Sequence, residues 1–263
     1  MLLPLTALAV CLAAAGRSTW SPCGLSMLST ITPMTERAGG RRYEVTVRWF
    51  VLGALAGGLC LGAVMAGLAG AVAATGPTAR TTVALALGAC LLAAASDLGI
   101  RGLRLPVHRR QVNERWLDEF RPWVYGTGFG WQLGTGLATY ITTCGVYLLV
   151  VLGALTGRPV TALALGAVFG IVRGLAILVG RAVTGPGAMR ALHRRLSRLE
   201  PASRRVVIGT ELAAAVSCAL VLPGRSAGVG VAFAVCVVAV VVLAVVAVAW
   251  AAALARSAPT GEG

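Results

Sequence analysis

Residues 20–33, WSPCGLSMLSTITP, interrupt an apolar N-terminal segment with two prolines and several hydroxyl side chains. Proline lacks an amide hydrogen and ends or kinks a helix. Such a break is tolerated at membrane depth only where protein or a water-filled cavity satisfies the freed backbone groups. We therefore expect two helical segments that meet near residues 17–22, with Cys23 at the break.

The composition of the whole chain is typical of a membrane protein. The 263 residues are 57% hydrophobic, with a mean hydropathy of +0.84, which is too apolar for a soluble domain of this size. The net charge of +14 comes from arginines that lie between apolar segments, so membrane orientation explains it better than nucleic-acid binding. Since Lys is absent and Ala, Gly, Val and Leu are abundant, we expect a GC-rich bacterial source and the cytoplasmic membrane.

Seven stretches approach the length of about 20 apolar residues that crosses a bilayer. Most of the 23 basic residues fall in alternate connections, so the positive-inside rule places the N-terminus outside and the C-terminus inside. No basic residue precedes the first apolar stretch, which argues against a cleaved signal peptide. The predicted spans are 3–33 (broken), 49–73, 81–99, 124–153, 160–180, 206–222 and 228–254.

A second stretch, 140–149 (YITTCGVYLL), repeats features of the first. Cys-Gly occurs in both, and a hydroxyl residue lies two positions before each cysteine. Each stretch leads into a span with glycines four residues apart, such as Gly53 and Gly57, which favour close helix packing. Because spans one and four have opposite predicted directions, we expect an all-α membrane domain with a 3+3 inverted repeat.

This interpretation divides the single membrane domain, residues 1–263, into parts. Residues 1–99 and 124–222 are the two three-helix repeats, and 228–254 is an appended seventh helix. The connection 100–123 has apolar residues at helical spacing, which predicts a cytoplasmic interfacial helix. A docking surface for a cytoplasmic partner is the alternative for this connection.

Two cysteines on symmetry-related helices, Cys23 and Cys144, could form a disulfide if their Cα atoms come within about 7 Å. The alternative is that both are small buried residues. Helix-breaking or hydroxyl residues surround both sulfurs and could line a cavity: Ser21, Pro22, Gly24, Ser26 and Pro33 at the first site, and Thr142, Thr143 and Gly145 at the second.

A family resemblance rests on these stretches. Ser21-Pro22-Cys23 resembles the first-helix motif of the DsbD/CcdA-type membrane thiol–disulfide electron carriers, the cytochrome c biogenesis transmembrane family. Residues 128–130 (Gly-Phe-Gly), Gly134 and Thr143-Cys144 resemble the corresponding fourth-helix region, and the likeness covers about residues 3–222, mostly as topology.

The resemblance implies that Cys23 and Cys144 carry reducing equivalents from cytoplasmic thioredoxin to extracytoplasmic thioredoxin-like proteins, as a thiol–disulfide oxidoreductase without a cofactor. The family usually has proline just before the second cysteine, where this chain has Thr143. This departure predicts a less broken fourth helix and a less accessible Cys144.

The remaining candidates are charged residues near or inside the spans. Arg173 lies midway along the fifth span, where a charge is a functional candidate, although it could extend to the interface instead. Asp97 and Glu211 lie near span ends and are expected at the interface. With His108 and His193 both in loops, neither haem ligation nor a histidine metal site is expected inside the membrane.

Two other functions remain open at this point. A small-solute transporter could use the same inverted-repeat scaffold, with Arg173 binding an anion. A non-catalytic membrane subunit could associate with partners through its glycine-rich helix faces.

Overall fold

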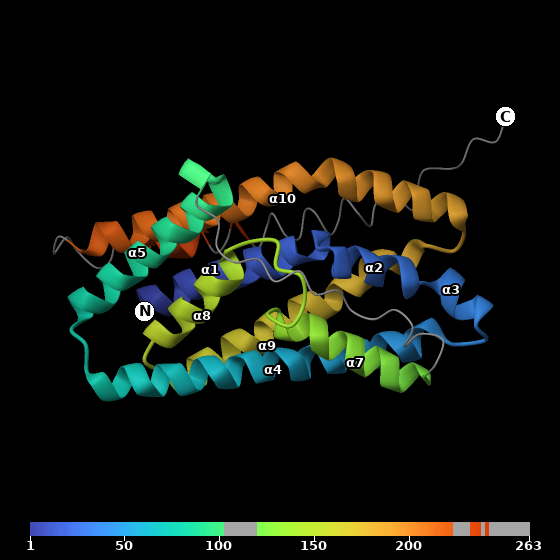
Figure 1. The fold of residues 1–263 in the computed structure, drawn as a ribbon, viewed down its shortest axis with the longest axis horizontal. Coiled ribbons are helices and arrows are strands. Elements are labelled where there is room, and N and C mark those ends of the chain that lie inside the picture. The colour runs from blue at the N-terminus through green and yellow to red at the C-terminus, as the bar shows by residue number, and fades with distance from the viewer. Residues whose placement is uncertain (103–119, 223–231, 238–239, 242–263) are drawn as a thin grey trace.

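The computed structural model describes residues 1–102, 120–222, 232–237 and 240–241 (Figure 1). Within these ranges every regular element is a helix and there is no strand. The elements are α1 (Leu2–Arg17), η1 (Ser18–Trp20), α2 (Pro22–Thr30), α3 (Pro33–Ala38), α4 (Tyr43–Thr75), α5 (Ala79–Leu98), η2 (Ile100–Gly102), α7 (Pro122–Thr135), α8 (Gly145–Leu155), α9 (Pro159–Leu175), η3 (Ala176–Ala182) and α10 (Pro186–Val221).

Four helical stretches in the described residues are long and apolar enough to cross a membrane. They are Leu2–Trp20, Tyr43–Thr75, Ala79–Leu98 and Pro159–Ala182. The prediction of an all-helical chain with membrane-spanning helices is therefore confirmed at this level. The expected interfacial helix at 100–123 and the seventh helix at 228–254 lie largely outside the described residues.

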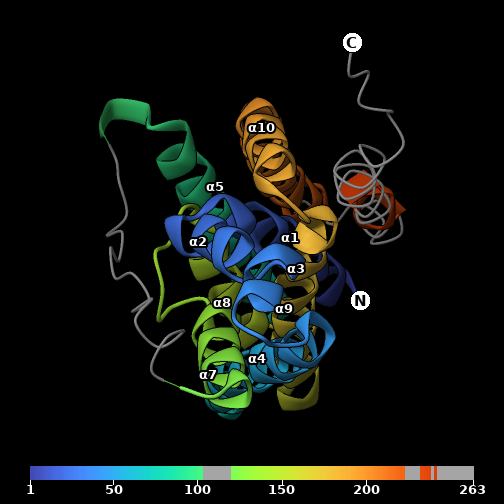
Figure 2. The ribbon, with the colours of Figure 1, turned by 90° about the vertical axis from the view of Figure 1, so that its right-hand side faces the viewer.

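The helices are arranged around α1. Viewed end-on, α4, α7 and α9 lie on one side of α1 and α2, while α5 and α10 lie on the other (Figure 2). The contacts agree, because α1 packs against α8, α9 and α10, and α5 packs against α10. This arrangement leaves the N-terminal segment as an internal element of the bundle.

Glycines bring α4 close to its two neighbours, α7 and α9. Gly53 and Gly57 face the backbone of α7, whereas Gly58 and Gly62 face that of α9. A Cβ atom at any of these positions would overlap backbone atoms of the facing helix. The predicted close packing through glycines four residues apart is confirmed, and it follows the small-residue rule for membrane helices.

The first helix break lies where the sequence places it. Helix α1 ends at Arg17, and Ser21 adopts an extended conformation before Pro22 begins α2. The Ser21 hydroxyl accepts a hydrogen bond from the Gly24 amide at 3.1 Å, which caps α2. Proline at the first helical position needs no amide partner, so these local residues suffice to end one helix and start the next.

The second break is larger than predicted. Instead of a less broken helix over 124–153, α7 ends at Thr135 and α8 begins only at Gly145. Gly136 ends α7 with φ +68°, a conformation that residues with a side chain rarely adopt. The prediction was wrong because glycine, rather than proline, ends this helix.

Helix α10 also differs from the prediction. It is one helix of 36 residues with Pro201 inside it. It combines the expected arginine-rich connection before residue 206 with the predicted sixth span, 206–222. Leu192, Leu196, Ser203 and Val207 are buried and recur at helical spacing. The arginine-rich half of α10 therefore packs on the bundle through one face.

Candidate functional site

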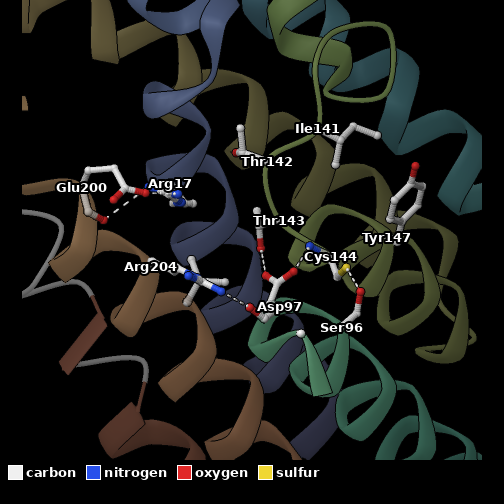
Figure 3. Close-up of a pocket in the computed structure, with 12 residues that line it drawn as sticks. Arg17, Ser96, Asp97, Ile141, Thr142, Thr143, Cys144, Tyr147, Glu200 and Arg204 are labelled. Carbon is white, nitrogen blue, oxygen red and sulfur yellow. Dashed lines mark hydrogen bonds and ion pairs between the residues drawn. The ribbon is translucent and has the colours of Figure 1, made fainter. Parts of the chain in front are cut away.

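A cavity of about 330 Å³ lies at the second helix break (Figure 3). It is bounded by the end of α5, the segment leading into α8, and the middle of α10. Backbone groups at a helix break need hydrogen-bond partners, and residues of this cavity supply them. Its lining residues are Arg17, Ser96, Asp97, Gly99, Ile141, Thr142, Thr143, Cys144, Tyr147, Glu200, Arg204 and Val207.

Asp97 holds the start of α8. Its carboxylate accepts one hydrogen bond from the Cys144 amide, at 2.9 Å, and another from the Thr143 hydroxyl. The same hydroxyl accepts a hydrogen bond from the Gly145 amide at 3.1 Å. The first amides of a helix lack intrahelical partners and favour a negative charge. Among the described residues, α8 is therefore capped from α5 rather than by its own N-cap side chain.

The Cys144 thiol faces the end of α5. It donates a hydrogen bond to the Ser96 hydroxyl at 3.1 Å (Figure 3). Cys144 is 7% exposed and belongs to the cavity lining. Cys144 is therefore buried, and it lies at the wall of a cavity.

Two arginines connect the cavity walls. Arg17, at the end of α1, forms an ion pair with Glu200 and donates a hydrogen bond to the Ser203 hydroxyl at 2.8 Å. Arg204 donates to the backbone carbonyl of Asp97 at 2.7 Å, near the C-terminal end of α5, where a cation is favoured. The arginines thus attach α10 to α1 and to α5, on either side of the cavity.

Glu211 lies behind this site on α10. It is 1% exposed, and in the described part of the chain neither carboxylate oxygen has a hydrogen-bond partner. A Cβ atom at Gly145 would lie 3.5 Å from its Oε1, so Glu211 approaches the start of α8. The structure therefore buries this carboxylate inside the bundle, at a large desolvation cost.

Cys23 lies in a different part of the core. It is 2% exposed and packs with residues of α2, α4 and α7, whereas Cys144 belongs to the cluster around α1, α8 and α9. No disulfide joins these two described residues. The other predicted residues of the first site, Ser21, Pro22, Gly24, Ser26 and Pro33, lie in α2, its cap and the start of α3.

Arg173 is buried beside the first break. It is 3% exposed, and its guanidinium carbon lies 5.9 Å from the centre of the Phe169 ring. It is close enough to Cys23 for an electrostatic interaction. Within the described residues its Nη2 atom has no hydrogen-bond partner. Arg173 is therefore enclosed within the bundle.

The structure brings together only the second group of predicted residues. Thr142, Thr143 and Cys144 line the cavity, and Gly145 adjoins it. Sequence reasoning missed the partners that complete the site, which are Ser96, Asp97, Glu200 and Arg204. The available signal was the presence of both charge signs, with Asp97 at the end of α5 and Glu200 and Arg204 in the middle of α10, where only orientation was inferred.

Comparison with known proteins gives one consistent name. Similar proteins are the methylamine utilization protein MauF of Paracoccus versutus, 34% identical over 174 residues, and that of Methylobacillus flagellatus, 33% identical over 186 residues. These matches cover 62% and 66% of this chain, and 60% and 63% of the relatives. The chain thus spans about 60% of the length of the curated relatives it matches. No family model and no solved structure matches it.

These relatives correct the expected family. They are named for methylamine utilization, so the assignment to the DsbD/CcdA-type carriers is wrong. The inferred transfer of reducing equivalents from thioredoxin to thioredoxin-like partners is wrong with it. Neither the transporter nor the non-catalytic subunit interpretation gains support. The physical reason is that Ser-Pro-Cys and Thr-Cys are short motifs, and their prolines and hydroxyls serve to cap and break helices.

Proposed function

We propose that this chain is a membrane-embedded accessory protein of methylamine utilization. The observation that carries the proposal is the shared name of relatives from five organisms, which are 30–34% identical over 164–186 residues. The apolar helices Tyr43–Thr75 and Pro159–Ala182 support a location in the membrane.

The polar cavity residues support an accessory role rather than a catalytic one. Asp97 caps α8, the Arg17–Glu200 pair joins α1 to α10, and Arg204 joins α10 to α5. These groups pair mainly with one another and hold the cavity walls in place. We infer that the surroundings of Cys144 form the functional site, and that the first break around Cys23 acts in folding.

We further propose the finer membrane arrangement. Residues 1–99 and 124–222 form inverted repeats within one domain, linked by the interfacial connection 100–123 and followed by a seventh helix at 228–254, in a bacterial cytoplasmic membrane. The support is that α1–α2 and α7–α8 are both broken segments, each followed by two long helices. The arginine distribution favours an external N-terminus and an internal C-terminus.

Growth on methylamine tests the proposed function. We expect a host from which the coding sequence is deleted to lose growth with methylamine as the only nitrogen source and to grow normally with ammonium. A plasmid copy of the full chain should restore growth on methylamine. Unchanged growth of the deletion strain on methylamine, or a host unable to use methylamine at all, would contradict the proposal.

A further inference from the structure

The first half of α10 has two opposite faces. Leu192 and Leu196 are buried against the bundle, whereas Arg190, Arg194 and Arg198 are exposed. Residues two apart in a helix point about 200° away from each other, so these three arginines lie on the side turned away from the leucines. They are four residues apart and follow a line of about 12 Å along the helix. We call these three residues the arginine face.

The arginine face is not neutralised by the part of the chain that the structure describes. The ion pairs there are Arg17–Glu200 and Arg41–Glu36, and neither includes a residue of this face. Glu200 is the only acidic residue in the first half of α10, and Arg17 occupies it. Three exposed guanidinium groups in a row create a positive potential, which attracts an anionic partner.

Two tryptophans mark the membrane surface at one end of the bundle. Trp49 in α4 and Trp123 in α7 are 40% and 53% exposed, and their ring centres lie 6.5 Å apart. Exposed tryptophans gather at the level of the lipid headgroups. The starts of α4, α7 and α10 all lie at this end, together with α3 (Figure 1).

Hydrogen bonds connect the arginine face to the same end. His193, next to Arg194, shares a hydrogen bond of 3.1 Å with Ser29 at the end of α2. In the following helix, α3, the Glu36 carboxylate accepts a hydrogen bond of 2.7 Å from the Tyr125 hydroxyl of α7. The arginine face therefore lies at the end of the bundle where the tryptophans indicate the headgroups.

We propose that the arginine face binds the headgroups of anionic phospholipids. Guanidinium groups pair bidentately with phosphate oxygens, and a cluster of basic residues beside membrane-spanning helices is typical of anionic-lipid recognition. The tryptophan pair favours lipid over an acidic protein as the partner, because it places the same end of the bundle among headgroups. The inference does not depend on the proposed function in methylamine utilization.

Native mass spectrometry of the full chain, purified in detergent, tests the proposal. The probes are dioleoylphosphatidylglycerol and dioleoylphosphatidylcholine at equal concentrations, which share their acyl chains and differ in net headgroup charge. We expect the wild-type chain to retain the anionic lipid about ten-fold more than the zwitterionic one. Arg194→Gln/Arg198→Gln removes two charges of the arginine face and should lower this preference to about two-fold.

The matched control removes the same charge elsewhere. Arg80→Gln/Arg158→Gln changes two exposed arginines, near the start of α5 and just before α9, and should keep the wild-type preference. Arg194→Lys/Arg198→Lys keeps the charge and should also keep most of the preference. All four positions are exposed, so detergent-mediated unfolding should be unchanged in every variant.

Two results would overturn the proposal. Equal retention of both lipids by the wild-type chain would assign the arginine face to an acidic protein instead. Equal loss of preference in the two glutamine variants would show that net charge, rather than this face, selects the lipid.

Discussion

The break between α1 and α2 and the break between α7 and α8 both place a cysteine at the start of the second segment. At the first break, the Ser21 hydroxyl accepts a hydrogen bond from the Gly24 amide, three residues later in the chain. Cys23 is buried in the core there. At the second break, Asp97 from α5 accepts a hydrogen bond from the Cys144 amide in addition to the local Thr143–Gly145 hydrogen bond, and Cys144 lines a cavity. The first break is capped by a residue next to it in the chain, and core side chains fill the space around it. The second break is capped from another helix, and a cavity remains between the helices.

The largest expected effect comes from filling the first break. A Cβ atom at Gly24 would lie 2.9 Å from the Ser18 carbonyl oxygen and closer still to that of Thr19. Because these atoms belong to the backbone, the break itself would have to shift. We expect Gly24→Ala to lower the free energy of unfolding by about 3 kcal/mol, measured by detergent-mediated unfolding in mixed micelles.

The matched control is Gly67→Ala in α4, where no atom lies within 4 Å of an added Cβ. Alanine is the better helix former, so this change should raise the free energy of unfolding by about 0.5 kcal/mol. Equal effects of the two substitutions would show that the first break is not closely packed.

The second break should respond to loss of its distant cap. Asp97→Ala removes the acceptor for the Cys144 amide and the Thr143 hydroxyl. Because both donors are buried, we expect the free energy of unfolding to fall by about 2 kcal/mol. Hydrogen exchange of the first amides of α8 should also become faster, while exchange in α2 stays unchanged.

Asp97→Asn measures the contribution of the negative charge separately from that of the hydrogen-bond acceptor. It keeps one acceptor oxygen and loses the negative charge favoured at a helix start, so its effect should be about half as large. Faster exchange in α2 with unchanged exchange in α8 would contradict the assignment of Asp97 as the cap of α8.

The first break could be predicted from sequence because its determinants are neighbours in the chain. Ser21 and Pro22 act within one helical turn, and each has a known preference at a helix start. Gly58 and Gly62 were equally informative, since their spacing alone indicates a close helix contact. In both cases the residues that carry the signal lie within about one helical turn of one another, although the glycines contact α9 more than 100 residues later in the chain.

The second break and its site depend on contacts that no local pattern records. Asp97 lies 47 residues before the amide that it caps, and Arg17 pairs with Glu200 across 183 residues. Glu211 lies near the end of an apolar stretch, where an interfacial position is the usual expectation, yet packing against α8 buries it. Only the assembled bundle reveals these partners.

Apart from the control substitutions, the smallest expected effect is a difference in thiol reactivity between the breaks. Cys144 lines a cavity of about 330 Å³, whereas Cys23 is 2% exposed and belongs to the core cluster that includes Met27, Leu28 and Ile177. In the folded protein, methyl methanethiosulfonate should therefore modify Cys144 about ten-fold faster than Cys23, a difference of about 1.4 kcal/mol. Mass spectrometry of the two cysteine peptides at timed intervals measures both rates in one sample. Denaturation should make the rates similar. Equal rates in the folded protein would mean that the first break also opens to small molecules, and the contrast between a closed and an open break would then fail.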